Sequence, residues 1–215
     1  MTKSNYAATE VAKGGRSPRR HQQSRLITRS LTACLAVGTA ISMAGSVSIF
    51  NARPAQAFSL EGCQWSSVSP VHYYNRSSGT YHTVNDQAAN NWTATPTAVW
   101  LAPSGSGSPI TLYDSNDGNT GYSGWANYYC YYSLMFRADG HSNTYLTNQS
   151  QYSYGAKVSV MTHEVGHDLG LGHNDNTRVC SQIPVMYSND SPRWFGCSIN
   201  TPQKDDINGL LYMYG

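Results

Sequence analysis

Charged side chains are scarce in this sequence: Lys, Arg, Asp and Glu together make up 12% of its 215 residues. Residues 1–57 hold eight basic side chains and a single acidic one, a net charge of +7. Because the whole chain carries +2, residues 58–215 carry −5. A mildly acidic region without a basic patch is unsuited to binding nucleic acid, so we expect no nucleic-acid partner.

Cysteine pairs with C-x-x-C spacing are absent, which argues against a zinc site built from cysteine ligands. After residue 57 the chain has four cysteines: Cys63, Cys130, Cys180 and Cys197. An even number in an exported domain favours two disulfides, and four cysteines allow three connectivities. We favour Cys180–Cys197, which closes a short loop, together with Cys63–Cys130, which ties down the N-terminus.

A long apolar run occurs at Leu31–Phe50, but its many Gly, Ser, Thr and Ala residues make it only weakly hydrophobic. Basic residues precede this run, and the small-x-small site Ala55-Gln56-Ala57 follows it. This order predicts a signal peptide over residues 1–57, cleaved before Phe58; an uncleaved membrane anchor is the alternative. We therefore expect residues 58–215 to form one secreted, extracellular domain, monomeric and without stable membrane association.

The pattern of apolar and turn-forming residues after residue 67 predicts three helices and several strands. Strands are expected at residues 68–74, 98–101, 110–113 and 128–138, and helices at 84–95, 156–169 and 201–214, the last with Thr201 as cap and Pro202 at its first position. Residues 103–109 indicate a loop, and residues 142–154 a polar, irregular segment. This mixture around one core predicts the α+β class.

The stretch HEVGHDLGLGH, residues 163–173, holds three histidines and a glutamate. On a helix His163 and His167 lie one turn apart on the same face, so their imidazoles can bind one ion with bonds of ~2.0–2.1 Å. Glu164 points ~100° away around the helix. It is therefore too divergent to be a third ligand, but it is well placed to reach a water on the metal.

His173 cannot reach the same ion on a continued helix, because ten residues place it ~15 Å along the axis. Gly170 provides the solution, since glycine tolerates positive φ and commonly ends a helix. We expect the chain to turn back there, with Gly172 adding further freedom. Three neutral nitrogens with one open position are typical of a catalytic zinc site, whereas structural zinc sites have four protein ligands.

An amphipathic helix with incidental surface histidines is the alternative interpretation. At ordinary residue frequencies a lone H-E-x-x-H arises in roughly one chain in a hundred of this length. The added glycine and third histidine at fixed offsets lower that frequency to about one in 100,000. The spacing therefore favours the metal site.

These residues resemble the metzincin metallopeptidases, through H-E-x-x-H-x-x-G-x-x-H and a later Met-turn. The Met-turn candidate is Met186, and in this family such a methionine lies beneath the metal as an apolar floor. Residues 204–215 and 88–96 are similar to the last and first helices of the matrixin branch. The resemblance covers most of residues 68–215 and implies a twisted, mostly parallel sheet, an active-site helix, a Met-turn and a C-terminal helix around one catalytic Zn²⁺ ion.

The chain departs from the matrixin pattern in its N-terminal region, which has no propeptide with a cysteine latch. Cys63 as a zinc cap would leave three other cysteines, an odd number, so parity favours a disulfide. Asn174 follows His173, and no tyrosine stands two residues after Met186, so we expect no tyrosine ligand. The resemblance also implies that the α-ammonium of a mature N-terminus at residue 58 pairs with residue 205 or 206, both aspartates.

The resemblance implies a zinc endopeptidase acting on proteins or peptides. A bound zinc ion lowers the pKa of its water toward ~7 and polarises the scissile carbonyl. Glu164 then accepts the proton as general base and delivers it to the leaving amine. The resemblance implies an extended substrate along an edge strand, which we place near Leu134–Ala138. It also implies a side-chain pocket walled by the segment after Met186, including Ser188–Trp194.

Further metal sites receive little support from the spacing. A second, structural metal would need His72, His82 and His141, with Asp139 beside His141, and these residues lack the family's pattern. The run at residues 114–119 has its glycine one position early for a calcium loop, so a polar turn is the better interpretation. A structural Ca²⁺ or a second Zn²⁺ ion is therefore unsupported.

Two carboxylates flank the ligands. Asp168 either supports a histidine or is solvated, and Asp175 follows the third histidine.

Two other functions also fit this site: a secreted, non-proteolytic zinc-binding interaction module, and another zinc amide hydrolase. The first would be marked by a lost general base, whereas Glu164 is present. Comparing the digestion of short peptides with that of whole proteins distinguishes such a hydrolase from an endopeptidase.

Overall fold

The computed structural model of the protein describes residues 2–7 and 58–215. The rest of the predicted signal peptide, with its apolar run and cleavage site, lies outside these residues. Within the described ranges no helix is both long and apolar enough to cross a lipid bilayer.

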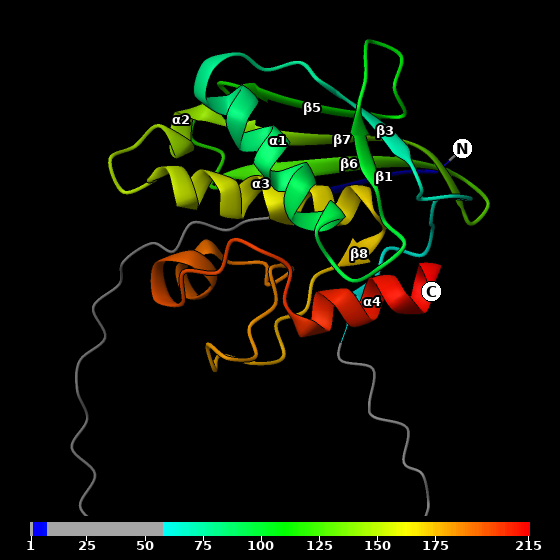
Figure 1. Cartoon of the computed structure of the whole chain (residues 1–215). Helices are drawn as coiled ribbons and strands as arrows, with labels where there is room; N and C mark the ends of the chain where they lie inside the picture. Colours follow the sequence, from blue (N-terminus) through cyan, green and yellow to red (C-terminus); the bar gives the residue numbers. More distant parts are fainter. Residues whose placement is uncertain (1, 8–57) are drawn as a thin grey trace, which may run out of the picture. The chain divides into compact units, whose positions relative to one another are not determined.

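Six strands form one mixed sheet in the order β1-β6-β7-β5-β3-β4 (Figure 1). Their bounds are β1 Thr2–Ala7, β3 Val71–Asn75, β4 Leu101–Pro103, β5 Ile110–Ser115, β6 Gly124–Tyr131 and β7 Leu134–Asn143. Strands β4, β3, β5 and β7 are parallel, whereas β6 pairs antiparallel with β7, and β1 with β6. Within residues 58–215 the sheet is therefore mostly parallel, with β6 as its antiparallel edge strand.

Two long helices, α1 (Gly79–Thr93) and α3 (Tyr154–Asp168), pack against each other and against the sheet (Figure 1). Helix α1 buries Val84, Ala88 and Trp92, as the sequence predicts, because residues four apart share one face of a helix. A short helix, α2 (Thr144–Thr147), lies within the segment that we expected to be irregular. The observed class, α+β with a C-terminal helix, agrees with the prediction.

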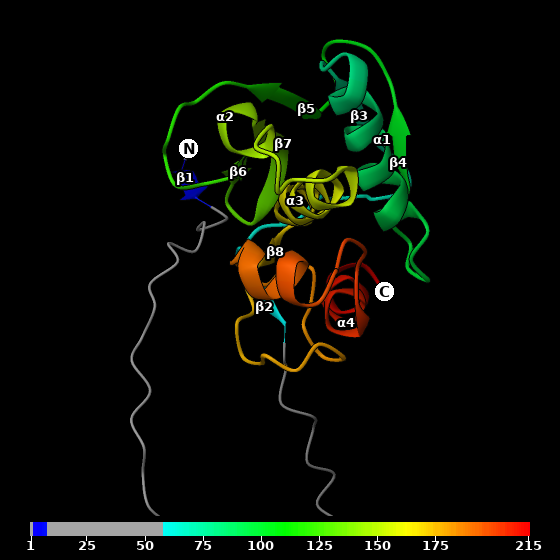
Figure 2. The same cartoon turned by 90° about the vertical axis from the view of Figure 1, so that its left-hand side faces the viewer.

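The chain after α3 forms β8 (Leu171–Gly172), the π-helix η1 (Ser191–Gly196) and α4 (Lys204–Tyr214). Figure 2 shows α3 between the sheet and these C-terminal elements. Helix α3 is therefore covered on both sides, and every residue of it from Val158 onward is buried. Because of this position, the polar residues in the second half of the helix are buried and do not form a solvent-facing stripe.

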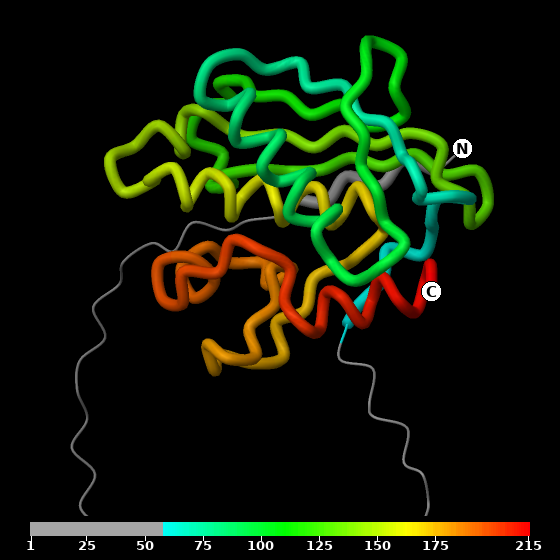
Figure 3. Tube along the Cα trace, viewed as in Figure 1, coloured from blue at the N-terminus to red at the C-terminus, as the bar shows by residue number. Residues whose placement is uncertain are grey.

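A second, two-stranded sheet joins β2 (Ser59–Leu60) antiparallel to β8. In the tube of Figure 3 the chain that begins at Phe58, coloured cyan, passes beside the yellow β8 segment before it enters the large sheet. Neither of these two-residue strands was predicted, because a pair this short has no visible periodicity in the sequence.

Residues 128–138, expected as one strand, instead form a hairpin of β6 and β7 around Tyr132 and Ser133. Tyr132 has φ of 53°, a left-handed conformation that is typical of Gly or Asn in a tight turn, so a tyrosine there gave no turn signal. The expected edge strand at Leu134–Ala138 is also wrong. This segment begins β7, which lies between β6 and β5.

The starts of β4 and α4 differ from those expected. Strand β4 starts at Leu101, three residues later than the predicted 98. Helix α4 starts at Lys204 and is capped by Gln203, whose side chain forms a capping box with Asp206. Thr201 and Pro202 therefore lie outside the helix, because the Gln203–Asp206 box satisfies its first backbone donors.

Two disulfides are present, as the even cysteine count indicates. They join Cys63 to Cys130 and Cys180 to Cys197, the connectivity that the sequence favours. Both are consistent with folding in an oxidising compartment. The first attaches the segment before β3 to β6, and the second closes the loop that precedes α4.

Candidate metal centre

The histidine-bearing helix begins and ends at recognisable signals. At its start the Ser153 side chain accepts a hydrogen bond from the backbone N–H of Ala156, at 3.3 Å. At its end Gly170 has φ of +95°, the left-handed conformation that reverses the chain after Leu169. The predicted break at Gly170 is thus confirmed, and β8 brings the chain back toward the helix.

Gly172 has a different role from the expected one. It lies in the extended strand β8 and does not adopt positive φ. A Cβ on this residue would lie 2.9 Å from the Oγ of Ser59. Its small size therefore allows β2 to approach β8, and the return of the chain depends on Gly170 alone.

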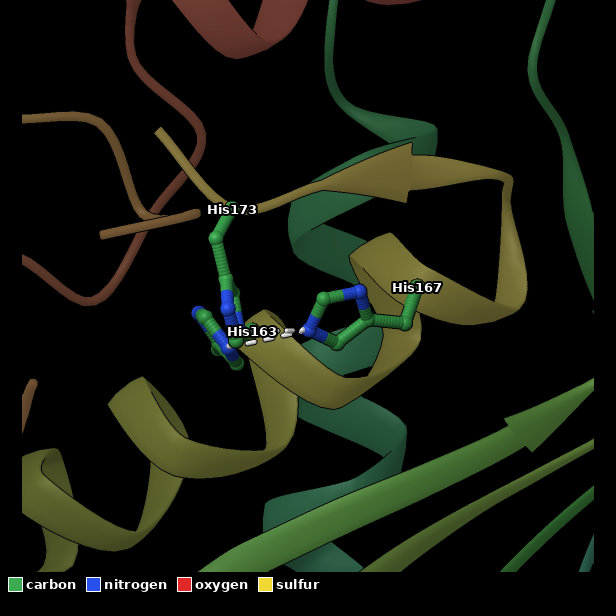
Figure 4. A group of neighbouring side chains, drawn as sticks. All are labelled: His163, His167 and His173. Carbon is green, nitrogen blue, oxygen red and sulfur yellow. Dashed lines mark hydrogen bonds between the residues drawn. The ribbon is translucent and has the colours of Figure 1, made fainter. Parts of the chain in front are cut away.

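The three histidines converge on one another (Figure 4). His163 and His167 extend from adjacent turns of α3, and His173 approaches from the end of β8. Their Nε2 atoms form a triangle in which each of the three distances is 3.1 Å. Among the described residues this is the one group of three or more potential metal ligands that lies this close.

Hydrogen bonds at the opposite ring nitrogens orient two of these imidazoles. Nδ1 of His163 lies 2.8 Å from the carbonyl oxygen of Val185, and Nδ1 of His167 lies 2.8 Å from that of Leu171. A carbonyl oxygen can only accept, so each Nδ1 carries the proton and each Nε2 keeps a lone pair. The lone pairs are therefore on the nitrogens that face the other histidines.

Burial favours the neutral form of His163 and His173. It lowers the pKa of His163 well below its usual value, and the nearby Arg193 charge lowers it further. Burial, aided by His167, lowers the pKa of His173 to about 4. Neutral imidazole is the form that binds a metal ion.

The donor set fits a zinc ion. In a tetrahedral site with Zn–N bonds of ~2.0–2.1 Å, the nitrogens are separated by about 3.4 Å. The 3.1 Å spacings are close to this value, so a small adjustment of the rings suffices. Three nitrogen ligands would leave one tetrahedral position for water or substrate. The cluster is therefore a possible three-histidine metal site.

Glu164 is fully buried beside this cluster. Neither of its carboxylate oxygens has a hydrogen-bond partner among the described residues. A Cβ on Gly124 would lie 2.7 Å from Oε1, so the carboxylate faces the start of β6. Burial raises the pKa of Glu164 well above its usual range, and the charge of Arg193 opposes this shift. An unpaired buried carboxylate with a raised pKa is typical of a functional site.

The two flanking carboxylates lie in different surroundings. Asp168 fits neither of its two expected roles: it is fully buried against Gly140 of β7, and neither of its oxygens has a hydrogen-bond partner among the described residues. Burial raises its pKa well above the usual range. Asp175 instead accepts hydrogen bonds from the backbone N–H and the hydroxyl of Ser188, and so connects the loop after His173 to the segment after Met186.

Met186 lies beneath the histidine-bearing helix. Its sulfur packs against α3 at Gly166, where a Cβ would also lie 2.8 Å from Trp92. Asp206 holds the turn from the other side: it accepts hydrogen bonds from the backbone N–H groups of Val185 (2.8 Å) and Met186 (3.1 Å). Burial raises the pKa of Asp206 to about 7, although these hydrogen bonds favour its ionised form.

A buried ion pair, Asp190–Arg193, lies next to His163. Arg193, fully buried in η1, donates to Asp190 at 2.5 Å and to the carbonyl oxygen of Tyr187 at 2.6 Å. The Nη1 that donates to Tyr187 lies 2.9 Å from Nδ1 of His163. Because this Nη1 has Tyr187 as its acceptor, the Nδ1 proton of His163 remains directed at Val185. No periodicity marked Arg193 or Asp190 in the sequence as buried residues.

Within residues 58–215 the remaining histidines, His72, His82 and His141, do not gather at a second site. His82 pairs with Asp86 one turn along α1, at 3.2 Å, and His72 lies exposed on β3. His141 is buried and lies 2.6 Å from Asp117. The run at residues 114–119 begins in the last two residues of β5 and continues as a loop, in which Asn143 donates to the carbonyl oxygen of Gly118 and accepts from the N–H of Asp117. The polar-turn interpretation of this run therefore agrees with the structure.

Phe58, the first residue of the predicted domain, packs on α4. The ring of Phe58 lies 5.4 Å from that of Tyr212 and contacts the backbone at Gly209. Asp206 already accepts three backbone hydrogen bonds, and Asp205 accepts one from Asn174 at 2.7 Å. An ion pair between the α-ammonium of Phe58 and either residue stays a prediction.

Glu61 is a residue of the site that the sequence did not indicate. Its carboxylate lies 2.9 Å from Nδ1 of His167, 106 positions along the chain.

No protein-family model matches this chain, and no curated protein matches it either.

Proposed function

We propose that the protein is a secreted zinc-dependent endopeptidase of metzincin type, similar to the matrixin branch. The observation that supports this most is the convergence of three histidine Nε2 atoms next to Glu164, a buried carboxylate without a hydrogen-bond partner. His163, His167 and His173 would hold the ion. When bound, zinc acidifies a coordinated water and polarises a carbonyl group.

Glu164 is the proton carrier in this proposal. Burial raises its pKa, which suits a group that takes up a proton during the reaction and returns it to a leaving amine. The carboxylate faces β6, the strand at the edge of the sheet within residues 58–215. A general base at this edge would lie beside a peptide bond of a substrate paired with β6.

The edge of β6 is suited to an extended peptide. In the structure it pairs antiparallel with Thr2–Ala7, in register from Cys130 to Trp125. These six residues belong to the predicted signal peptide, so their removal would free the backbone groups of β6 for a substrate strand. We therefore place substrate binding at β6 instead of Leu134–Ala138.

Next to this edge, the segment after Met186 would shape a substrate side-chain pocket. Its interior contains the Asp190–Arg193 pair, which also binds Ser123 and Tyr152 through Asp190. A rigid, hydrogen-bonded polar group in this position would limit the depth of such a pocket.

The proposal is tested by separating metal binding from catalysis. The full-length chain is expressed, and the processed protein is assayed on casein and on a short fluorogenic peptide, with and without a zinc chelator. Glu164→Gln should retain about one zinc per chain, because it removes no ligand, and should lose at least about 10²–10⁴-fold in rate. His167→Gln should lose both zinc and activity, whereas the control His82→Gln should keep both.

Each contrary result has a specific meaning. Wild-type activity in Glu164→Gln would remove the general base from the reaction. A zinc-loaded protein that cleaves neither substrate would favour the non-proteolytic binding module. Cleavage of the short peptide alone would favour another amide hydrolase.

A further inference from the structure

The first residues of the predicted domain, Phe58–Trp65, run along the loop that carries the third histidine. We call this segment the strap. It pairs with β8 through β2, and the N–H of Glu61 donates to the carbonyl oxygen of Gly170 at 2.9 Å. The indole N–H of Trp65 donates to the carbonyl oxygen of Asp168 at 2.7 Å. The strap is thus attached to the end of α3 and to the whole return of the chain.

Glu61 turns its side chain from the strap toward the histidine cluster. Its Oε1 lies 2.9 Å from Nδ1 of His167, and its Oε2 accepts a hydrogen bond from the hydroxyl of Tyr128 at 2.7 Å. The Glu61 side chain is 4% exposed, and that of His167 is fully buried. The contact is therefore a buried carboxylate–imidazole pair and not a loose surface contact.

The proton of this pair is on the imidazole. Nδ1 of His167 faces both Glu61 and the carbonyl oxygen of Leu171, and the carbonyl oxygen can only accept. The Nδ1–H group is therefore shared between two acceptors, and Nε2 presents its lone pair to the other histidines. A carboxylate at Nδ1 increases the basicity of the imidazole and fixes the orientation of its ring.

We propose that Glu61 is a positioning residue of the metal centre, which holds His167 in the metal-binding tautomer and orientation and compensates part of the charge of a divalent ion. The proposal rests on the metal site of the proposed function, but it does not depend on the peptidase reaction. Three neutral histidines add no negative charge to a site that takes a dication. In a buried environment, the negative charge of a carboxylate bonded to one of these histidines interacts strongly with the ion.

The fold allows this role to be separated from a purely structural one. The strap has three attachments that do not involve the Glu61 side chain: its backbone pairing with β8, the Cys63–Cys130 disulfide and the Trp65 hydrogen bond. A substitution at Glu61 should therefore leave the strap in place. Its effect should appear in the affinity for metal more than in the stability of the metal-free protein.

The experiment measures zinc affinity of the processed, metal-free protein by competition with a chromogenic chelator, without any substrate. Glu61→Ala should weaken zinc binding about 10–100-fold, the usual effect of removing the partner of a metal-bound histidine. Glu61→Gln keeps the shape of the side chain and removes its charge, and should also weaken binding. Asp86→Asn is the matched control, because it removes a carboxylate from an exposed histidine, His82, on α1.

A second readout is thermal unfolding of each variant in the metal-free state. The proposal is supported if both Glu61 variants lose zinc affinity while their unfolding midpoints stay as close to the parent as that of Asp86→Asn. It is overturned if both bind zinc as tightly as the parent, or if the loss appears only together with an unfolded metal-free protein. Should Glu61→Ala fail to fold, Glu61→Gln provides the same two readouts. A parent that binds zinc but cleaves nothing would contradict the proposed function and leave this test intact.

Discussion

Gly166, in the middle of the histidine motif, is required by packing and not by backbone conformation. It lies inside α3, where glycine is disfavoured relative to alanine. A Cβ there would meet the sulfur of Met186 and lie 2.8 Å from the indole of Trp92. The Trp92 ring cannot move easily, because its N–H donates to the carbonyl oxygen of Thr162. Only a residue without a side chain lets the helix rest on the methionine.

Gly166→Ala should therefore destabilise the protein although it improves helix propensity. We expect a loss of about 1–2 kcal/mol in the free energy of unfolding, because the destabilisation from overpacking a filled core exceeds the gain in helix propensity from Gly to Ala. Urea unfolding of the metal-free protein measures it. Gly105→Ala is the control: its Cβ would meet nothing within 4 Å, so it should stay within about 0.5 kcal/mol of the parent. Equal stability of the two variants would contradict this packing argument.

At the same scale, the sequence predicted the convergence of His163, His167 and His173, because their spacing encodes the site locally. The roles of Glu61 and Arg193 could not be predicted. Glu61 contacts a histidine 106 positions away, and Arg193 one 30 positions away. Such contacts depend on how the strap and η1 pack, which leaves no periodic trace in the chain.

Among the elements, α4 is connected to the turn beneath the histidines through the side chain of Asp206. Asp206 accepts the N–H of Gln203 at the start of α4, and those of Val185 and Met186 in the turn beneath the histidines. The same carboxylate therefore caps a helix and fixes a loop.

Asp206→Asn should uncouple the helix from this turn. An amide has one accepting oxygen and would leave buried N–H groups unpaired, so we expect a loss of about 1–3 kcal/mol in unfolding free energy. Measurement at pH 8, above the pKa of about 7, keeps the parent carboxylate ionised. Its neighbour provides the comparison: in Asp205→Asn the new amide can still accept from Asn174, so the change should be small. If the two substitutions cost the same, Asp206 has no special role.

Element prediction succeeded where the pattern was long and regular, as in α1, α3 and α4. It failed at the β6–β7 hairpin, because β-forming residues occupy both strands and the turn itself contains Tyr132 in a left-handed conformation. It also missed β2 and β8. These short strands form because Gly170 reverses the chain and the strap packs against the returning segment.

For the molecule as a whole, acid sensitivity should arise in part from His141. Its Nε2 lies 2.6 Å from Asp117, while its Nδ1 is buried without a partner among the described residues. Burial lowers the pKa of His141, against the opposing charges of Asp117 and Asp114. Hydrogen bonds from Ser115, Trp125 and His141 outweigh the burial of Asp117 and lower its pKa, so it stays ionised in mild acid.

The sign of the effect follows from proton uptake. The unfolded chain binds a proton at His141 near pH 6.5, and the folded protein only at lower pH, so stability falls as the pH decreases below about 6.5. His141→Phe lacks this group. The difference in unfolding free energy between parent and variant should therefore shrink from pH 8 to pH 5, as measured by urea unfolding at each pH. A constant difference would show that His141 does not contribute.

The strap and α4 have a consequence for the order in which the protein is made. The segment around the third histidine pairs with Ser59–Leu60, near the start of the predicted domain, and its Asn174 donates to Asp205 of α4. During synthesis the strap emerges before the histidines do. The turn beneath the histidines, however, has no acceptor for its N–H groups until α4 emerges. A nascent chain therefore carries all three histidines before the turn beneath them is fixed, and the centre is completed only after α4 has emerged.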